Sequence, residues 1–153
     1  MRALIIVLLA ATIGPVQADD PKAHAPAFDA ALAQKLGADD YGMHSYVLVI
    51  LKTGPNKMPA GPERDAMFRG HFANIKRLAN EGKLVLAGPF DGTSDWRGMF
   101  VFDAKTVDEA KALTATDPVI ESGEMVAEYH VYYGSAALKL VNETHAKIQK
   151  KSF

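Results

Sequence analysis

The sequence predicts an α+β fold in which strands and helices follow the order β-α-β-β-α-β, with one further helix at the C-terminus. Two observations predict it: a β-α-β pattern occurs twice in succession, and the helix in each copy carries recognisable start signals. This split βαβ order is the ferredoxin-like pattern. Right-handed crossovers then place both helices on one face of a four-stranded antiparallel sheet. The opposite face needs a cover, either a second copy of the chain, which gives a dimeric α/β barrel, or the C-terminal helix.

The strands are predicted from hydrophobic runs and the turns between them. Residues 44–52 are apolar on both alternating faces, which is typical of a strand covered on both sides. Residues 83–90 and 96–103 form a pair joined by the hairpin loop 91–95. Residues 124–133 alternate partially and predict the fourth strand.

The two main helices have clear boundaries. Pro62 suits a first helical turn and Gly82 a helix stop, so the first helix is expected between them. Thr106 and Glu109 form a capping box that starts the second helix, which is expected to end near Thr114. The first helix carries one apolar stripe at spacings of three and four: Met67, Phe68, Phe72, Ile75, Leu78 and Ala79.

Residues 1–18 have the layout of a secretory signal peptide. Met1-Arg2 is a positive start, Ala3–Ile13 is an apolar run of about 11 residues, and cleavage is expected after Ala18. The run is well short of the roughly 20 residues that span a bilayer, although an uncleaved N-terminal anchor is the alternative. The expected location is therefore secreted or periplasmic, with no membrane span after cleavage.

The remaining chain divides into an N-terminal arm (19–42), one domain (43–134), and a C-terminal helix and tail (135–153). Ser135 is expected to cap the C-terminal helix, with Lys139, Glu143 and Lys147 at i,i+4 spacing. The net charge of −1 gives no indication of a nucleic-acid partner, and the absence of cysteine excludes disulfides, thiol chemistry and iron–sulfur clusters.

His71 and Asp117 are the leading candidates for chemistry. His71 lies in or beside the apolar stripe, where a neutral imidazole near an edge could act as a general base. Pro118 holds Asp117 extended just past a helix end, so its carboxylate could orient His71. The alternatives are a core histidine satisfied by a backbone carbonyl, and a plain turn at Asp-Pro. Spacing alone favours these alternatives.

Other candidates are weaker. Gly88, Pro89 and Phe90 mark a close backbone approach or a strand edge that could shape a pocket wall, and Trp96 could cap a pocket mouth. A plain strand exit and a core-covering aromatic are the alternatives. His44 is expected at the surface, and His130 on a solvated strand face. No H-E-x-x-H, phosphate loop or G-x-S-x-G is present, so no local metal motif is predicted.

The order and spacing of these motifs resemble the YCII-related (YciI-like) family. The matching segments are residues 71–78, the strand 82–89 that reads GKLVLAGP, the helix 108–113, Asp117-Pro118 and Gly123, within about 46–133. The resemblance implies a dimeric α/β barrel with an active site built on a His-Asp pair, which maps onto His71 and Asp117. It also implies chemistry that needs a general base and no cofactor, such as dehydrochlorination of a hydroxyquinol or proton shifts on small cyclic acids. The leader, arm and C-terminal helix depart from the family pattern.

These observations give a leading hypothesis and two alternatives. The leading one is an exported, cofactor-independent lyase or isomerase that acts on a small cyclic or aromatic acid, with His71 as base and Asp117 orienting it. Residues 88–90 and Trp96 would bind the substrate, and the protein would be a homodimer. The alternatives are a non-catalytic small-ligand-binding protein and a dimer scaffold of the cell envelope.

Overall fold

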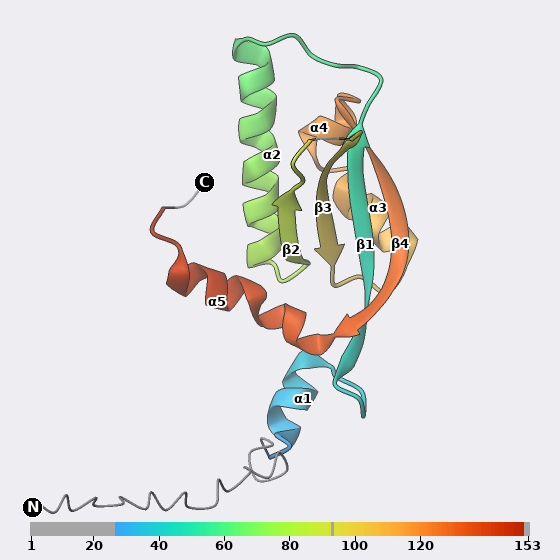
Figure 1. Ribbon diagram of the computed structural model, residues 1–153, viewed down its shortest axis with the longest axis vertical. Coiled ribbons are helices and arrows are strands. Elements are labelled where there is room, and N and C mark those ends of the chain that lie inside the picture. The colour runs from blue at the N-terminus through green and yellow to red at the C-terminus, as the bar shows by residue number, and fades with distance from the viewer. Residues whose placement is uncertain (1–26, 93, 152–153) are drawn as a thin grey trace, which may run out of the picture.

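The computed structural model describes residues 27–92 and 94–151 and contains one antiparallel sheet of four strands (Figure 1). The strands are β1 (Met43–Thr53), β2 (Leu84–Pro89), β3 (Trp96–Phe102) and β4 (Met125–Ser135), and they lie in the order β2-β3-β1-β4. The two strands that begin and end the βαββαβ repeat, β1 and β4, are therefore neighbours. This order confirms the predicted ferredoxin-like fold.

The three predicted helices occur in the predicted order, and the described residues contain further short helices besides them. The helices are α1 (Ala30–Leu36), α2 (Pro62–Asn80), α3 (Val107–Thr114), α4 (Pro118–Glu121) and α5 (Val141–Ile148), with a 3-10 helix η1 (Ala136–Leu140) before α5. The predicted boundaries of α2 are confirmed, since it begins at Pro62 and Gly82 follows its end with φ +69°. The four-residue α4 was not predicted, because it begins directly at the Asp-Pro turn.

Both main helices pack on one face of the sheet. Val47, Val49 and Leu51 of β1 point to this face, together with Phe100 and Phe102 of β3. They meet side chains from three helices in a single buried cluster: Met67 and Leu78 of α2, Ala110 of α3, and Val119 of α4. The predicted apolar stripe of α2 is confirmed at Met67 and Leu78, which are buried, and in part at Phe68, Ile75 and Ala79, which are half-buried. It is wrong at Phe72, whose side chain is 46% exposed.

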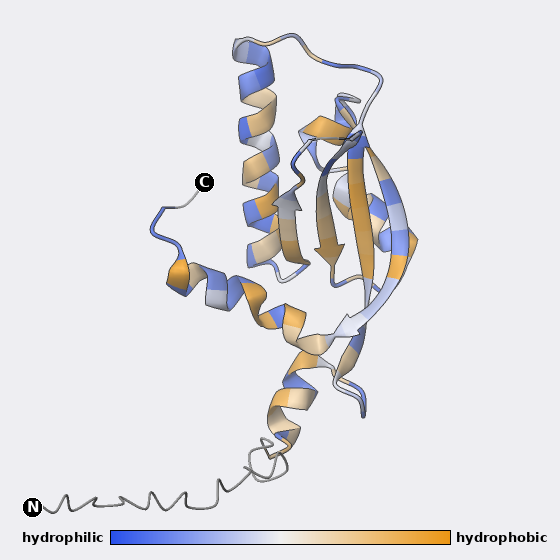
Figure 2. Ribbon diagram, viewed as in Figure 1, coloured by the Kyte–Doolittle hydropathy of each residue, from blue (hydrophilic) through white to orange (hydrophobic). Residues whose placement is uncertain are grey.

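The opposite sheet face is covered only in part by the protein's own chain. Tyr46, Val85 and Val101 form a second buried cluster there, and Leu138 of η1 packs against it. Figure 2 shows hydrophobic residues along β1 and β3, and mixed residues along β4. The following helix α5 has no buried residue and runs out beyond the edge strand β2 (Figure 1). The C-terminal segment therefore covers one end of this face through η1.

The predicted C-terminal helix is wrong at its start. Ser135 does act as a cap, but of the 3-10 helix, where its hydroxyl accepts from the Ala137 N–H. The tighter winding turns Lys139 toward the sheet, where its Nζ lies 2.8 Å from Asp103 instead of continuing the helical charge ladder. The second half of the ladder is present, with Lys147 and Glu143 2.7 Å apart.

The predicted leader 1–18 and residues 19–26 of the arm lie outside the described residues. Over the described part of the chain, no helix combines the length and hydropathy needed to cross a bilayer.

Candidate functional site

His71 and Asp117 form a buried pair. Nδ1 of His71 lies 2.8 Å from Oδ2 and 3.0 Å from Oδ1 of Asp117. The Asp117 side chain is fully buried and that of His71 is 9% exposed. The structure brings together the two residues that were predicted as partners, although 46 positions separate them in the sequence.

The local fold explains how each residue reaches the other. His71 lies in the middle of α2 and points inward with the apolar stripe. Asp117 is extended at φ −94° and ψ 123°, as expected before a proline, and caps α4 by accepting from the Val119 N–H. Helices α2 and α4 approach closely at Gly70: a Cβ added to this residue would lie only 3.0 Å from the Pro118 ring. A glycine beside His71 therefore permits the contact.

The hydrogen bond fixes the tautomer of His71. A carboxylate only accepts hydrogen bonds, so Nδ1 carries the hydrogen and Nε2 of the neutral ring holds a free lone pair. Nε2 has no hydrogen-bond partner among the described residues. All fully shielded side-chain nitrogens and oxygens in the described residues do have partners. Nε2 is thus not completely shielded from solvent.

Three aromatic rings surround the imidazole. The ring centroids of Phe72, Phe68 and Phe100 lie 5.3, 6.1 and 6.1 Å from that of His71. Phe68 is itself held by the Arg64 guanidinium, 4.6 Å above its centroid. Flat rings at these distances and tilts present an apolar, aromatic surface around the nitrogen base.

A polar cluster braces the loop that carries Asp117. Oδ1 of Asn74, one turn along α2 from His71, accepts from the Thr116 hydroxyl at 3.0 Å and from Arg77 at 2.6 Å. Arg77 also donates to the Thr116 oxygen. The residue before Asp117 is thereby tied to the helix that carries His71, which holds the pair in register.

Glu124 is a second buried carboxylate, which the sequence prediction missed. The strand pattern placed it on a solvated face, but its side chain is fully buried. It accepts from the Met58 N–H at 2.6 Å and from Arg64 at 2.9 Å. Burial raises the pKa of this carboxyl, but the Met58 and Arg64 donors outweigh it and hold the pKa below its usual value. Glu124 fastens the loop 54–61 to the start of α2.

The predicted substrate-binding residues lie together on the β2–β3 hairpin. The rings of Phe90 and Trp96 are 5.5 Å apart. Neither ring is among the three that flank His71, so Phe90 and Trp96 form a separate aromatic contact. Of the two alternatives predicted at Gly88, the strand edge is the one observed, because β2 is an edge strand and a Cβ on Gly88 would meet nothing within 4 Å. The glycine that a close approach requires is Gly98 on β3, where a Cβ would lie 2.9 Å from the Gly88 carbonyl oxygen. A role for Gly88, Pro89, Phe90 and Trp96 in substrate binding stays a prediction.

Two other histidines have structural partners. His44 is half-buried, which corrects the expected surface position, and its ring nitrogens face the Gly37 carbonyl at 3.0 Å and Asp103 at 2.9 Å. His130 lies on an exposed face, 2.8 Å from Glu128. Among residues 27–92 and 94–151, no three His, Asp or Glu side chains are grouped so as to hold a metal ion.

Comparison with known proteins gives one family match for this chain. The model of the YCII-related domain matches residues 45–133. No curated protein matches the sequence. One similar solved structure is the 5-chloro-2-hydroxyhydroquinone dehydrochlorinase from Burkholderia phenoliruptrix AC1100, in complex with 2,5-dihydroxybenzoquinone. It is 20% identical, and the match covers 56% of this chain and 90% of that chain with a TM-score of 0.39.

Proposed function

Because the chain belongs to the YCII-related family, we propose that it is a cofactor-independent proton-transfer enzyme of the lyase or isomerase type. The single observation that supports this most directly is the His71–Asp117 pair, in which Nδ1 is fixed as donor and Nε2 has no partner among the described residues and is not completely shielded. The proposed substrate is a small cyclic or aromatic acid, since Phe68, Phe72 and Phe100 offer aromatic surfaces around that nitrogen.

In the proposed step, Nε2 of His71 takes a proton from an acidic C–H or O–H of the substrate, and the imidazole becomes an imidazolium. Asp117 stabilises that charge through the 2.8 Å hydrogen bond to Nδ1 and keeps the ring oriented. The imidazolium then returns the proton to another substrate atom in an isomerisation. In an elimination, the electron pair left on the substrate expels a leaving group instead.

The proposal is tested by proton exchange. Wild-type protein is incubated in D2O with a panel of small cyclic acids and hydroxyquinols, and NMR follows replacement of substrate hydrogens by deuterium. We expect His71→Gln to lose about 100-fold or more of the exchange rate, which is the usual contribution of a general base. His130→Gln is the control for loss of another histidine, and its molecular mass in solution is first compared with that of wild type, because His130 lies opposite Leu48 on the sheet face away from the helices.

Two results would contradict the proposal. One is wild-type protein that exchanges no hydrogen of any compound in the panel. The other is His71→Gln protein that exchanges as fast as wild type at the same melting temperature.

We also propose that the protein is exported and processed after Ala18, as the leader pattern indicates. Mass spectrometry of protein recovered from outside the cytoplasm is expected to find Asp19 as the first residue. An intact Met1 in all recovered protein would refute the processing.

We further propose that two copies pair through the open sheet face. Leu138 covers only the end of this face near Tyr46, Val85 and Val101, while Leu48 and Met99 beside them are only partly buried. An apolar sheet face of this kind is usually covered in the assembled protein.

A further inference from the structure

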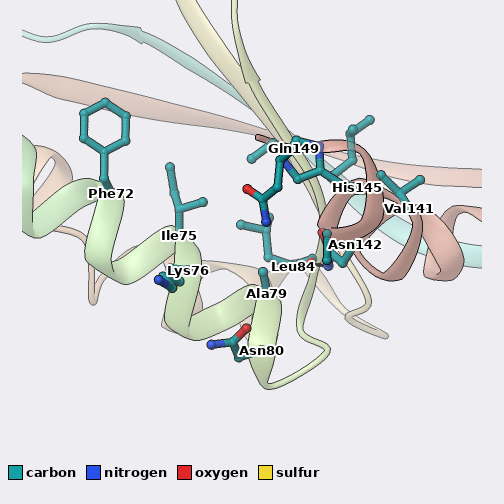
Figure 3. Close-up of a pocket in the computed structure, with 13 residues that line it drawn as sticks. Phe72, Ile75, Lys76, Ala79, Asn80, Leu84, Val141, Asn142, His145 and Gln149 are labelled. Carbon is teal, nitrogen blue, oxygen red and sulfur yellow. Dashed lines mark hydrogen bonds between the residues drawn. The ribbon is translucent and has the colours of Figure 1, made fainter. Parts of the chain in front are cut away.

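A groove lies between α2, α5 and the edge strand β2, with a cavity volume of about 300 Å³. Figure 3 shows α2 forming one wall and α5 the other. The apolar lining residues are Phe72, Ile75, Ala79, Leu84, Leu86, Ala87, Val141 and Ala146. The α5 wall lies outside residues 45–133, so this groove depends on a segment that the family domain does not include.

A hydrogen bond in its first turn holds α5 beside the groove. The Asn142 amide donates to the Leu84 carbonyl at 2.7 Å, which fixes the first turn of α5 against β2. Beyond this turn α5 contributes no buried residue, and Ala79 and Ile75 on α2 remain only partly buried. A ligand that covers this exposed apolar surface gains binding free energy of roughly 25 cal/mol for each Å² that it removes from water.

The polar side chains of the groove indicate the charge of its ligand. Lys76 on α2 and His145 on α5 line opposite walls, and no carboxylate is among the lining residues (Figure 3). Within the described part of the chain, neither side chain has an ion-pair or hydrogen-bond partner. Neighbouring basic residues do have partners: Arg77 pairs with Glu81, and Lys147 with Glu143. The groove therefore combines an apolar surface with the Lys76 ammonium group, which has no counter-ion among the described residues.

We propose that this groove binds a small apolar carboxylate, with its carboxylate between Lys76 and His145 and its apolar body against Ile75, Leu86 and Val141. A volume near 300 Å³ is at the lower end of the range for ligand pockets, which fits a compact acid. The groove is separate from the His71–Asp117 site: Phe72 forms its end and contacts the imidazole, but His71 is not a lining residue.

The test is calorimetric titration of the full chain with octanoate, with 1-octanol and octylamine as probes of the same chain length. Octanoate is expected to bind at one site per chain, octanol more weakly, and octylamine not measurably. Lys76→Met should weaken octanoate about fivefold to tenfold and leave octanol unchanged. Lys57→Met is the matched control, because Lys57 is exposed in the loop at the other end of α2 and should leave both affinities unchanged.

A second variant keeps the test independent of charge. Ala146→Trp, on the exposed helix α5, should fill the groove and abolish binding of both octanoate and octanol without loss of fold. His71→Gln should bind octanoate as wild type does, so that failure of the proton-transfer proposal and failure of this one are distinguishable.

Three outcomes would overturn the groove proposal: no octanoate binding, octanoate binding unaffected by both Lys76→Met and Ala146→Trp, or tighter binding of octylamine than of octanoate. A change in molecular mass of the Ala146→Trp protein in solution would also overturn it, because the groove would then hold a second copy of the chain.

Discussion

The hydrogen bond between His71 and Asp117 determines which ring nitrogen is free for chemistry. Asp117 also accepts from the Val119 N–H, so its carboxylate is held by a helix start as well as by the imidazole. Spacing alone favoured structural roles for both residues, and the resemblance to the YCII-related family is what predicted them as a pair. The distance between them depends on how α2 packs against α4, which the sequence does not predict.

Asp117→Asn is expected to lower the proton-exchange rate by at least tenfold, because the amide no longer stabilises an imidazolium. It should also destabilise the fold by about 1–2 kcal/mol, because an amide oxygen is a weaker acceptor than a carboxylate for the His71 Nδ1–H and the Val119 N–H. The ¹⁵N shifts of His71 should show an Nδ1–H tautomer in the wild type and a mixture in the variant. Asp108→Asn, at an exposed position of α3, is the control for both readouts. Unchanged exchange in Asp117→Asn would remove Asp117 from the mechanism.

Glu124→Gln tests the second buried carboxylate. The folded pKa of Glu124 lies below its ordinary value of 4.5, so its ionised form stabilises the fold above that pH, and this stabilisation is lost as pH falls through the folded pKa. We expect Glu124→Gln to be less stable than wild type by about 2 kcal/mol at pH 7, the usual range for hydrogen bonds to a charged group. The difference should shrink toward pH 3 in urea unfolding. A difference that stays constant with pH would contradict the assigned cause.

Among the elements, capped helices and strongly apolar strands were predicted well. Side-chain positions that depend on contacts between distant segments were not. Pro62, Thr106 and Gly82 mark helix ends locally, so the sequence alone places α2 and α3. Glu124 follows the alternation of β4, and only the packing of the loop 54–61 buries it. Similarly, Lys139 meets Asp103 because η1 winds more tightly than an α-helix, which i,i+4 spacing does not predict.

The β2–β3 hairpin offers a matched pair of glycine variants. Gly98→Ala should cost about 2 kcal/mol, because its Cβ would stand 2.9 Å from the Gly88 carbonyl oxygen and the backbone must shift. Gly88→Ala should change stability by less than about 0.5 kcal/mol, since its Cβ would meet nothing within 4 Å. Thermal melting of both variants checks this. Equal losses would mean that the two strands are not packed as described.

At the scale of the whole molecule, the sheet has one face filled by α2, α3 and α4, and one face covered only at its end. The sequence predicted that the second face needs a cover, because β1 is apolar on both sides. It left open whether the C-terminal helix or a second copy provides it. The structure shows that Leu138 of η1 covers part of this face and that α5 turns away from it. The remaining apolar surface around Leu48 and Met99 is what a second copy would bury.

Met99→Lys tests that arrangement directly. If two chains pair through the open face, a lysine at this position places a charge in an apolar interface, where burial is costly without a partner. We expect light scattering to give about twice the chain mass for wild type and a single chain mass for Met99→Lys. Val131→Lys makes the same kind of change at a position of β4 that is 74% exposed, and should remain dimeric. A monomeric wild type, or a Met99→Lys protein that stays dimeric, would mean that the open face does not pair two copies.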